Sequence, residues 1–355
     1  LNSKLIIIKD EIIIIKIYSG ETMFVVTGGA GFIGSNYVIN LVKNHKNKVI
    51  NIDKLTYAGS YKNIKLLEKN KNYRFVKANI GNSKIISKIL KNNKPRFIIN
   101  FAAETHVDRS IRNPEKFFNT NLLHSFNFFY EIYNYWKNLD SISKKRFRFL
   151  QISTDEVYGS LKNNEKPFKE DNLLKPNNPY SSSKAAFDNL IRGYSKTFGM
   201  PVLITRCSNN YGPRQNPEKL IPLCIKNLIN KKNIPVYGNG MQIRDWINVS
   251  DHCEAINKVL HKGKIGEIYN IGGSNEKINL NLVKLICNIF DEINSKNNFS
   301  HMSLIKHVKD RLGHDKRYSI NSSKIRRELN WRPKISFNEG IKKTIKWYLK
   351  NYNWK

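Results

Sequence analysis

Cysteine is scarce in this 355-residue chain, which contains only Cys207, Cys224, Cys253 and Cys287. No two of them form a C-x-x-C pair, and no cluster of histidines accompanies them. Zinc sites and disulfide frameworks depend on such spacings. We therefore expect reduced thiols, no bound metal and a cytoplasmic protein.

Long apolar runs are also missing. The runs at residues 5–8 and 12–17, the second broken by Lys16, are far shorter than the roughly 20 apolar residues of a membrane-spanning helix. No small-residue cleavage site typical of a signal peptide follows them. We expect no membrane association and interpret residues 1–22 as an extension outside the fold. An extra β-strand is the alternative, because β-branched residues favour strands.

Acidic residues are the third shortage. The chain has 28 aspartates and glutamates against 61 lysines and arginines, which gives a formal net charge of +33. Such a charge is typical of nucleic-acid binders. Here lysine is scattered over nearly every segment together with asparagine and isoleucine, and all three have A/T-rich codons, so biased codon usage is a sufficient cause. We expect no nucleic-acid partner; the alternative predicts tight, steeply salt-dependent binding.

Short apolar runs alternate with helical patterns through the first half of the chain. The runs are typical of buried parallel strands and lie at 23–27, 49–53, 73–76, 97–102 and 147–153. Between the first two, apolar residues recur at helical spacing. This alternation predicts an α/β fold with a Rossmann-type doubly wound parallel sheet.

The second half is less regular, because proline and glycine interrupt it, for example at Pro213, Pro235, Gly240 and Gly273. We interpret it as a smaller C-terminal α/β lobe. The predicted division is an extension at 1–22, a dinucleotide-binding domain at 23–200 and a mainly substrate-binding lobe at 201–355. Segments of this last part are expected to cross back to the first domain.

A glycine-rich turn lies between the first predicted strand and its helix, with glycines at 28, 31 and 34. Glycine lets backbone N–H groups approach a pyrophosphate, and the following helix offers its positive N-terminus to the same phosphates. Asp53 ends the next strand, 19 residues after Gly34, close to the roughly 20 expected for the acid that binds the adenosine ribose. A carboxylate there repels a 2′-phosphate, so we predict NAD rather than NADP.

Tyr180 and Lys184 are four residues apart at the start of a long predicted helix. Residues at this spacing share one helical face. A nearby ammonium lowers the pKa of a phenol by favouring the phenolate. The pair therefore predicts a base, and Lys184 could also hold the nicotinamide ribose.

Two adjacent carboxylates, Asp155 and Glu156, come just after the strand at 147–153. Ligands bind at the carboxyl ends of strands in sheets of this kind. Neighbouring acids in a closed site do not both ionise freely, so one pKa should rise. One proton donor beside one proton acceptor is what the elimination of water requires.

The glycine turn and the Tyr180–Lys184 pair resemble the extended short-chain dehydrogenase/reductase family. Four segments resemble its nucleotide-sugar dehydratase branch: AAETHVDRSI (102–111), STDEVYG (153–159), RCSNNYGP (206–213) and RDW (244–246). STDEVYG discriminates best, since sugar epimerases of the family usually lack the Asp-Glu pair. The likeness runs from Met23 to near the C-terminus, and it implies an NAD-dependent lyase that works as a homodimer on a nucleotide sugar.

The resemblance also implies a mechanism for converting dTDP-glucose to dTDP-4-keto-6-deoxyglucose and water. Tyr180 would take the proton of the 4-OH while hydride leaves C4 for NAD. Glu156 would remove the C5 proton, Asp155 would protonate the departing 6-OH, and Thr154 would hydrogen-bond O4. Hydride then returns to C6, so tightly bound NAD is regenerated in each turnover.

The contacts of each ligand are implied in the same way. Positions expected to touch NAD are Gly28, Gly31, Phe32, Ile33, Gly34, Asp53, Lys54, Leu55, Thr56, Asn79, Ile80, Ala102, Ala103, Glu104, Thr105, Thr120, Tyr180, Lys184 and Asn210. Positions expected around the nucleotide sugar are Thr105, Thr154, Asn209, Lys219, Leu220, Pro235, Val236, Tyr237, Arg244, Asn279, Arg311 and His314. Arg244 and Arg311 suit a diphosphate, because a guanidinium binds phosphate oxygens in a fork.

Three positions depart from the family's pattern. Asn79 stands where the family usually has Asp beside the adenine, and an altered adenine contact is expected. Leu312 replaces a usual Pro, which is expected to loosen the phosphate-binding loop. His124 replaces a usual Gly in the helix after Thr120, where local packing is expected to differ if that helix forms part of a dimer interface. His106 and His252 are expected to make structural hydrogen bonds, because other residues supply the chemistry.

Two further functions stay open from the sequence. The chain could be a dehydratase or epimerase acting on a UDP-, GDP- or CDP-linked sugar, although the Asp155–Glu156 pair argues against epimerisation. It could also be a non-enzymatic NAD-binding scaffold. Such scaffolds usually lose catalytic side chains, whereas Thr154, Tyr180 and Lys184 are all present here.

Overall fold

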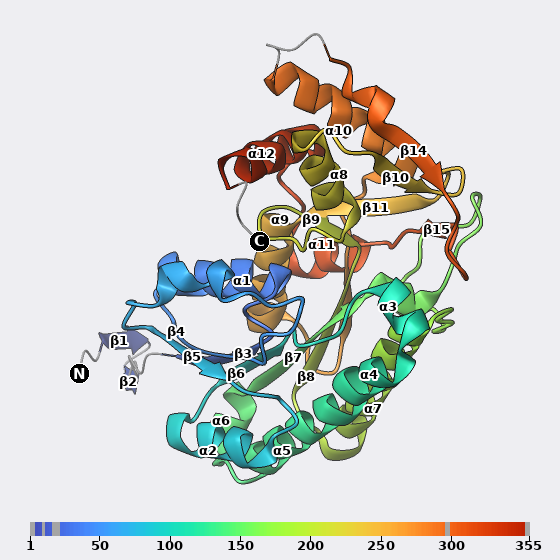
Figure 1. Ribbon diagram of the computed structural model, residues 1–355. Coiled ribbons are helices and arrows are strands. Elements are labelled where there is room, and N and C mark those ends of the chain that lie inside the picture. Colours follow the sequence, from blue (N-terminus) through green and yellow to red (C-terminus); the bar gives the residue numbers. More distant parts are fainter. Residues whose placement is uncertain (1–3, 9–10, 16–21, 295–298, 352–355) are drawn as a thin grey trace.

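A seven-stranded parallel sheet forms the centre of the molecule, in the strand order β12-β8-β7-β6-β3-β4-β5 (Figure 1). The computed structural model describes residues 4–8, 11–15, 22–294 and 299–351. The strands are β3 (Met23–Thr27), β4 (Lys48–Asp53), β5 (Tyr73–Lys77), β6 (Phe97–Asn100), β7 (Arg148–Thr154), β8 (Val202–Cys207) and β12 (Ile268–Ile271). The strand order reverses beside β3, which confirms the doubly wound prediction.

Helices cover both faces of this sheet. On one face lie α1 (Phe32–Lys43), α9 (Val249–Lys262) and α11 (Ser323–Leu329); on the other lie α2 (Ser83–Asn93), α5 (Ser125–Lys137) and α7 (Pro179–Phe198) (Figure 1). Successive strand residues point to opposite faces. Phe24 and Val26 are therefore buried against the first set of helices, while Val25 is buried against the second.

The predicted strand at 97–102 ends two residues early, as β6. Beyond Asn100 the chain turns around the glycine loop: the Phe101 N–H donates to the Thr27 carbonyl at 3.1 Å, and the Ala102 N–H donates to the Thr27 hydroxyl at 3.3 Å. Because Ala102 lies beyond the last paired residue of β6, it lines the cleft.

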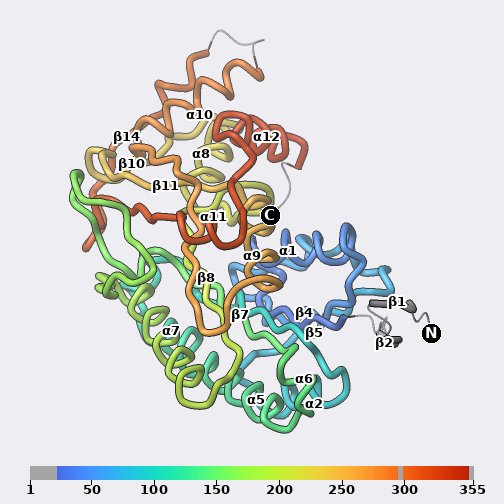
Figure 2. The backbone as a smooth tube through the Cα atoms, turned by 180° about the vertical axis from the view of Figure 1, so that it is seen from behind, coloured from blue at the N-terminus to red at the C-terminus, as the bar shows by residue number. Residues whose placement is uncertain are grey.

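A smaller lobe lies beyond the carboxyl ends of the strands (Figure 2). Its helices are α8 (Leu220–Ile229), α10 (Asn279–Ile293) and α12 (Phe337–Lys350), and its strands are β9 (Asn209–Tyr211), β10 (Ile234–Tyr237), β11 (Ile243–Asn248), β13 (Glu276–Ile278), β14 (Ile305–Val308) and β15 (Arg317–Tyr318). This lobe has its own core, built mainly from α8, α10 and α12. Since β8 and β12 belong to the central sheet, strand pairing alone does not decide the predicted boundary at residue 200.

Short helices complete the first half: α3 (Val107–Arg112), α4 (Pro114–Phe118), the π-helical turn η3 (Asn119–His124), α6 (Ser141–Arg146) and the 3-10 turns η1 (Tyr61–Asn63), η2 (Lys65–Leu67) and η4 (Asp155–Tyr158). Another 3-10 turn, η5 (His301–Leu304), precedes β14. Together α4, η3 and α5 follow one another without a break, so a π turn lies inside a longer helical rod.

Near the N-terminus, β1 (Lys4–Ile8) and β2 (Glu11–Ile15) pair with each other and with no strand of the central sheet. The interpretation of 1–22 as an extension stays a prediction. All four cysteines are buried and unbonded. Within the described ranges, no helix has the length and apolar character needed to cross a membrane, and no group of three or more His, Cys, Asp or Glu could hold a metal ion.

Candidate active site

The glycine turn brings two backbone segments unusually close together. Gly28 has φ +67°, and a Cβ there would lie 2.6 Å from the Ala102 nitrogen. A Cβ on Gly34 would lie 2.4 Å from the Gly28 carbonyl oxygen. Both positions therefore require glycine, and the start of α1 is held at the edge of a cleft where its free N–H groups face a ligand.

Asp53 ends β4 beside this turn, and its side chain is buried. One carboxylate oxygen accepts from the Ala30 N–H at 2.9 Å, and the other accepts from the Leu55 N–H at 2.8 Å. Burial raises the pKa of Asp53, and these two hydrogen bonds oppose the rise. Each oxygen keeps a lone pair for a further donor, which suits the two hydroxyls of a ribose.

The reaction centre forms where β7 runs into η4. Thr154 ends the strand, and its hydroxyl accepts from the Glu156 N–H at 3.3 Å and donates to Asp155 at 3.3 Å. Opposite lies the start of α7, where Asn178 caps the helix with a reciprocal pair of hydrogen bonds to Ser181. This cap fixes Tyr180 in the first turn of α7, next to the acidic pair.

One cleft of about 580 Å³ joins the glycine turn to the reaction centre. Both carboxylates, Thr154, Tyr180 and Lys184 line it. So does almost every residue predicted to touch NAD: Gly28, Gly31, Phe32, Ile33, Gly34, Asp53, Lys54, Thr56, Asn79, Ile80, Ala102, Ala103, Glu104, Thr105, Thr120 and Asn210. Leu55 is the exception and lies outside the lining.

The surroundings of the two carboxyl groups raise the pKa of Asp155 and of Glu156 for partly different reasons. Asp155 is 2% exposed, and one of its oxygens has no hydrogen-bond partner. Burial, followed by the charges of Glu156 and Asp245, raises its pKa well above the usual range. Burial also raises the pKa of Glu156, but Lys219 and Arg244 oppose that rise. Asp155 is therefore the better proton donor and Glu156 the better acceptor.

The expectation that Lys184 lowers the pKa of Tyr180 is not met in this chain. Burial raises the pKa of Tyr180 well above its ordinary value, and the charge of Glu156 raises it further; a hydrogen bond with Thr154 opposes the shift. The Lys184 ammonium instead donates to the Ile152 carbonyl at 2.8 Å, and burial lowers its own pKa. Lys184 is thus tied to β7, and Tyr180 is a phenol in the chain alone.

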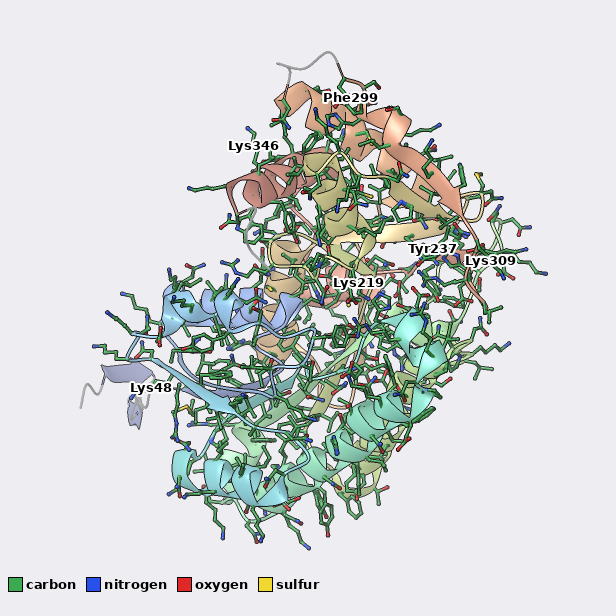
Figure 3. The ribbon with its side chains drawn as sticks, in the orientation of Figure 1. Lys48, Lys219, Tyr237, Phe299, Lys309 and Lys346 are labelled. Atoms are coloured by element: carbon green, nitrogen blue, oxygen red, sulfur yellow. The ribbon has the colours of Figure 1, made fainter. Side chains whose placement is uncertain are left out.

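Predicted sugar-nucleotide contacts divide into two groups. Thr105, Thr154, Asn209 and Lys219 line the cleft. The Lys219 ammonium donates to the Thr105 carbonyl at 2.9 Å and lies between the two lobes, whereas Tyr237 lies at the outer end of β10 (Figure 3). The others lie outside the cleft lining: Leu220 and Asn279 begin α8 and α10, Pro235, Val236 and Tyr237 lie on β10, Arg244 lies on β11, and Arg311 and His314 lie in the loop after β14.

Charges in this outer group already have partners. The Arg311 Nε lies 3.3 Å from an Asp108 oxygen, and its guanidinium stacks 5.0 Å from the centre of the Tyr237 ring. Arg244 is buried, donates to the Asp315 carbonyl at 2.9 Å and lies over the Tyr318 ring. Leu312, in the same loop, is 77% exposed.

Histidines flank the site. Burial lowers the pKa of His252 to about 3, and its Nδ1 lies 2.8 Å from the Asn210 amide oxygen. His106 lies 3.9 Å from Asp108 and 3.7 Å from Glu218, and burial lowers its pKa. His252 makes the structural hydrogen bond expected of it, whereas His106 lies near two carboxylates at distances too long for hydrogen bonds.

Several cleft residues escaped the sequence reasoning. They are Ala58, Gly59, Asn113, Glu115, Lys116, Asn119, Cys207, Ser208, Gln215 and Asn216. Gln215 and Asn216 follow the Gly-Pro turn after β9. Their closeness in sequence to Asn209 could have identified them as candidate cleft residues. Lys116 had no such signal, because its place depends on the ion pair of its ammonium with Glu104 at 3.2 Å.

Comparison with known proteins supports the same chemistry. Residues 25–344 match the family model described as GDP-mannose 4,6 dehydratase. A dTDP-glucose 4,6-dehydratase of Xanthomonas campestris is 47% identical over 332 residues, covering 93% of this chain and 94% of that protein. A dTDP-glucose 4,6-dehydratase from Bacillus anthracis, solved with NAD, has a TM-score of 0.82 and 43% identity, covering 94% of this chain and 98% of that one. One from Streptomyces venezuelae, also solved with NAD, has a TM-score of 0.84 and 39% identity over the same shares.

Proposed function

Because the chain belongs to the family described as GDP-mannose 4,6 dehydratase, we propose that it converts dTDP-glucose to dTDP-4-keto-6-deoxyglucose and water with NAD as cofactor. The observation that carries the proposal is the cleft in which Asp155, Glu156, Tyr180 and Lys184 meet the glycine turn. Relatives of this activity match the chain over nearly its full length.

The residues present fit NAD. The start of α1 offers its free backbone N–H groups to a pyrophosphate at the edge of the cleft, and Asp53 keeps acceptors for ribose hydroxyls. Lys184, which lines the cleft, is assigned to the nicotinamide ribose. NAD, when bound, supplies the hydride acceptor and a positive charge near the phenol.

The first step is oxidation at C4 of the glucose. Tyr180 accepts the proton of the 4-OH and C4 loses a hydride, so the alcohol becomes a ketone. The Thr154 hydroxyl orients O4. Because burial raises the pKa of Tyr180, its hydroxyl must first lose its own proton, and the positive charge that bound NAD would bring near the ring favours the phenolate.

The second step is elimination of water across C5 and C6. The 4-ketone acidifies the C5 proton, which Glu156 removes while Asp155 gives its proton to the departing 6-OH. The resulting alkene takes a hydride at C6 and a proton at C5, so the cofactor ends as it began. Burial raises the pKa of Asp155 and so favours the protonated form that acts as the donor.

Arg244, Arg311 and Lys219 are the cations that we assign to the diphosphate. The charges of all three oppose the rise in the pKa of Glu156, which supports assigning them to one region beside the reaction centre. The outer residues Tyr237, Asn279 and His314 are assigned to the remainder of the nucleotide.

Mass analysis tests the function. Incubation with dTDP-glucose and no added reductant should yield a product lighter by one water. UDP-, GDP- and CDP-glucose should react more slowly. Fast turnover of UDP-glucose with none of dTDP-glucose overturns the base assignment, and an epimer of unchanged mass identifies an epimerase. Protein that carries NAD yet leaves every sugar nucleotide unchanged is a scaffold.

We further propose that the chain forms a homodimer through α5 and α7. Aromatic residues gather on these helices, with Phe126, Tyr133 and Tyr194 in ring contact, and Tyr130 and Phe198 are 44% and 48% exposed. Apolar area of this kind is typical of an interface. Light scattering should give twice the chain mass. Tyr130→Glu should reduce it to one chain mass, whereas Ile142→Glu, on exposed α6, should not.

A further inference from the structure

The two departures Asn79 and His124 meet in the fold. Asn79 follows β5, and His124 ends the π turn η3, 45 residues later in the chain. The Asn79 Nδ2 lies 3.5 Å from the His124 Nδ1, and both residues line the cleft at the end that also holds Asp53. A substitution at one position is therefore in contact with a substitution at the other.

Gly81 is the third member of this arrangement. A Cβ on Gly81 would lie 2.6 Å from the His124 Cδ2 and 2.8 Å from its Cγ. The imidazole therefore packs against the backbone of Gly81, which fixes the plane of the ring. The π turn also contributes, because its extra residue per turn changes the direction in which the next side chains point.

Hydrogen bonding assigns the donors and acceptors. The Asn79 Oδ1 accepts from the Gly81 N–H at 2.9 Å, so the amide must present its NH₂ group to His124. The facing Nδ1 is then an acceptor, and a neutral imidazole must carry its proton on Nε2. Burial, followed by the charge of Lys54, lowers the pKa of His124 and favours the neutral ring. Within the described ranges, no hydrogen bond of Nε2 is found.

We propose that His124 recognises the adenine of NAD by donating a hydrogen bond from Nε2–H. Asn79 is the residue that positions the imidazole. A carboxylate in place of Asn79 would offer acceptors, which select the exocyclic amino group of adenine. In this chain the paired amide and imidazole offer a donor instead. A donor matches a ring nitrogen of adenine, and it also matches the oxygen that replaces the amino group in hypoxanthine.

The consequence is a relaxed choice of cofactor base. Nicotinamide hypoxanthine dinucleotide should bind nearly as tightly as NAD. The inference rests on NAD as the cofactor but not on the sugar chemistry, so it can be tested by binding alone. A chain that binds both dinucleotides and dehydrates nothing would contradict the proposed reaction and leave this inference intact.

The experiment measures dissociation constants by calorimetry on protein freed of nucleotide, for NAD and for nicotinamide hypoxanthine dinucleotide. In the wild type the two constants should agree within about threefold. His124→Phe keeps a ring over Gly81 but removes the donor, so both constants should rise about three- to tenfold, the worth of one hydrogen bond. His124→Gln restores a side-chain N–H and should recover part of the loss.

Two further variants complete the test. The double variant Asn79→Asp/His124→Gly should prefer NAD by about fivefold or more, because an acceptor again faces the base. His45→Phe, at an exposed histidine outside the cleft, is the matched control and should change neither constant. A wild-type preference for NAD of tenfold or more, or unchanged binding by His124→Phe, overturns the inference.

Discussion

The two halves of the candidate site are assembled in different ways. The half assigned to NAD comes from successive β-α units, in which the glycine turn, Asp53 and Asn79 each lie at or just after the end of a strand of the central sheet. The half assigned to the sugar nucleotide draws on β10, β11, helix starts and a loop after β14. Charged residues of this half also form ion pairs within the protein, as Arg311 does with Asp108. The first half is a rigid platform, and the second must exchange internal contacts for those of the ligand.

Tyr180 lies where the halves meet, and its loss should have the largest effect. Tyr180→Phe removes the group that accepts the 4-OH proton, so turnover of dTDP-glucose should fall by roughly 10³-fold or more. Because the platform is untouched, the dissociation constant for NAD should change less than about threefold. Mass analysis of the product over time measures the turnover, and calorimetry measures the dissociation constant.

Tyr61→Phe, at a partly exposed tyrosine outside the cleft, is the matched control and should keep wild-type turnover. Turnover by Tyr180→Phe within tenfold of the wild type is incompatible with the phenol as the base.

Glu156→Gln separates the two chemical steps. The amide does not accept the C5 proton, so dehydration should fall by roughly 10²- to 10³-fold. Oxidation at C4 needs only Tyr180 and the cofactor, so NADH should still appear in a single turnover. Rapid-quench mass analysis should show the 4-ketone without loss of water. Glu292→Gln, at an exposed position of α10, should behave as the wild type. Full dehydration by Glu156→Gln would show that another group removes the C5 proton.

The features that the sequence predicts well lie mainly in the half of the site assigned to NAD. The strand positions of the first half, the glycine turn and the place of Asp53 at a strand end were predictable, because apolar periodicity and turn chemistry are local in sequence. The contact of Asn79 with His124 was not, although both residues had been noticed, since a π turn and the packing on Gly81 create it. The pKa of Tyr180 was misjudged for a related reason: spacing places Lys184 on the same helix face, but only the fold ties its ammonium to Ile152.

The buried carboxyl group of Asp155 affects the free energy of unfolding as well as the reaction. Its folded-state pKa is raised, so its contribution to stability is complete below the unfolded pKa of about 3.9 and is lost as pH rises through the folded pKa. Asp155→Asn should abolish dehydration and raise the free energy of unfolding at neutral pH by roughly 0.5 to 2 kcal/mol. The gain should shrink as the pH falls toward 4.

Denaturant titrations at several pH values measure this effect. Asp171→Asn, at an exposed aspartate, should leave the pH dependence of unfolding unchanged. An Asp155→Asn variant that is less stable than the wild type at neutral pH would mean that the buried carboxyl group is stabilising, contrary to the direction of its pKa.

The smallest effect should come from the contacts within the substrate half. Asp108→Asn removes the charge that holds Arg311 and weakens the hydrogen bond from Tyr237 to Asp108, 3.4 Å long in the wild type. Arg311 is then freer to bind phosphate, so the KM for dTDP-glucose should fall by up to about fivefold, the range of a partly exposed ion pair. Neither kcat nor NAD affinity should change.

Glu339→Gln, which breaks the exposed pair with Lys343 on α12, is the control. A higher KM in Asp108→Asn would mean that Asp108 positions Arg311 for the ligand, and the substrate half would then be as preorganised as the cofactor half.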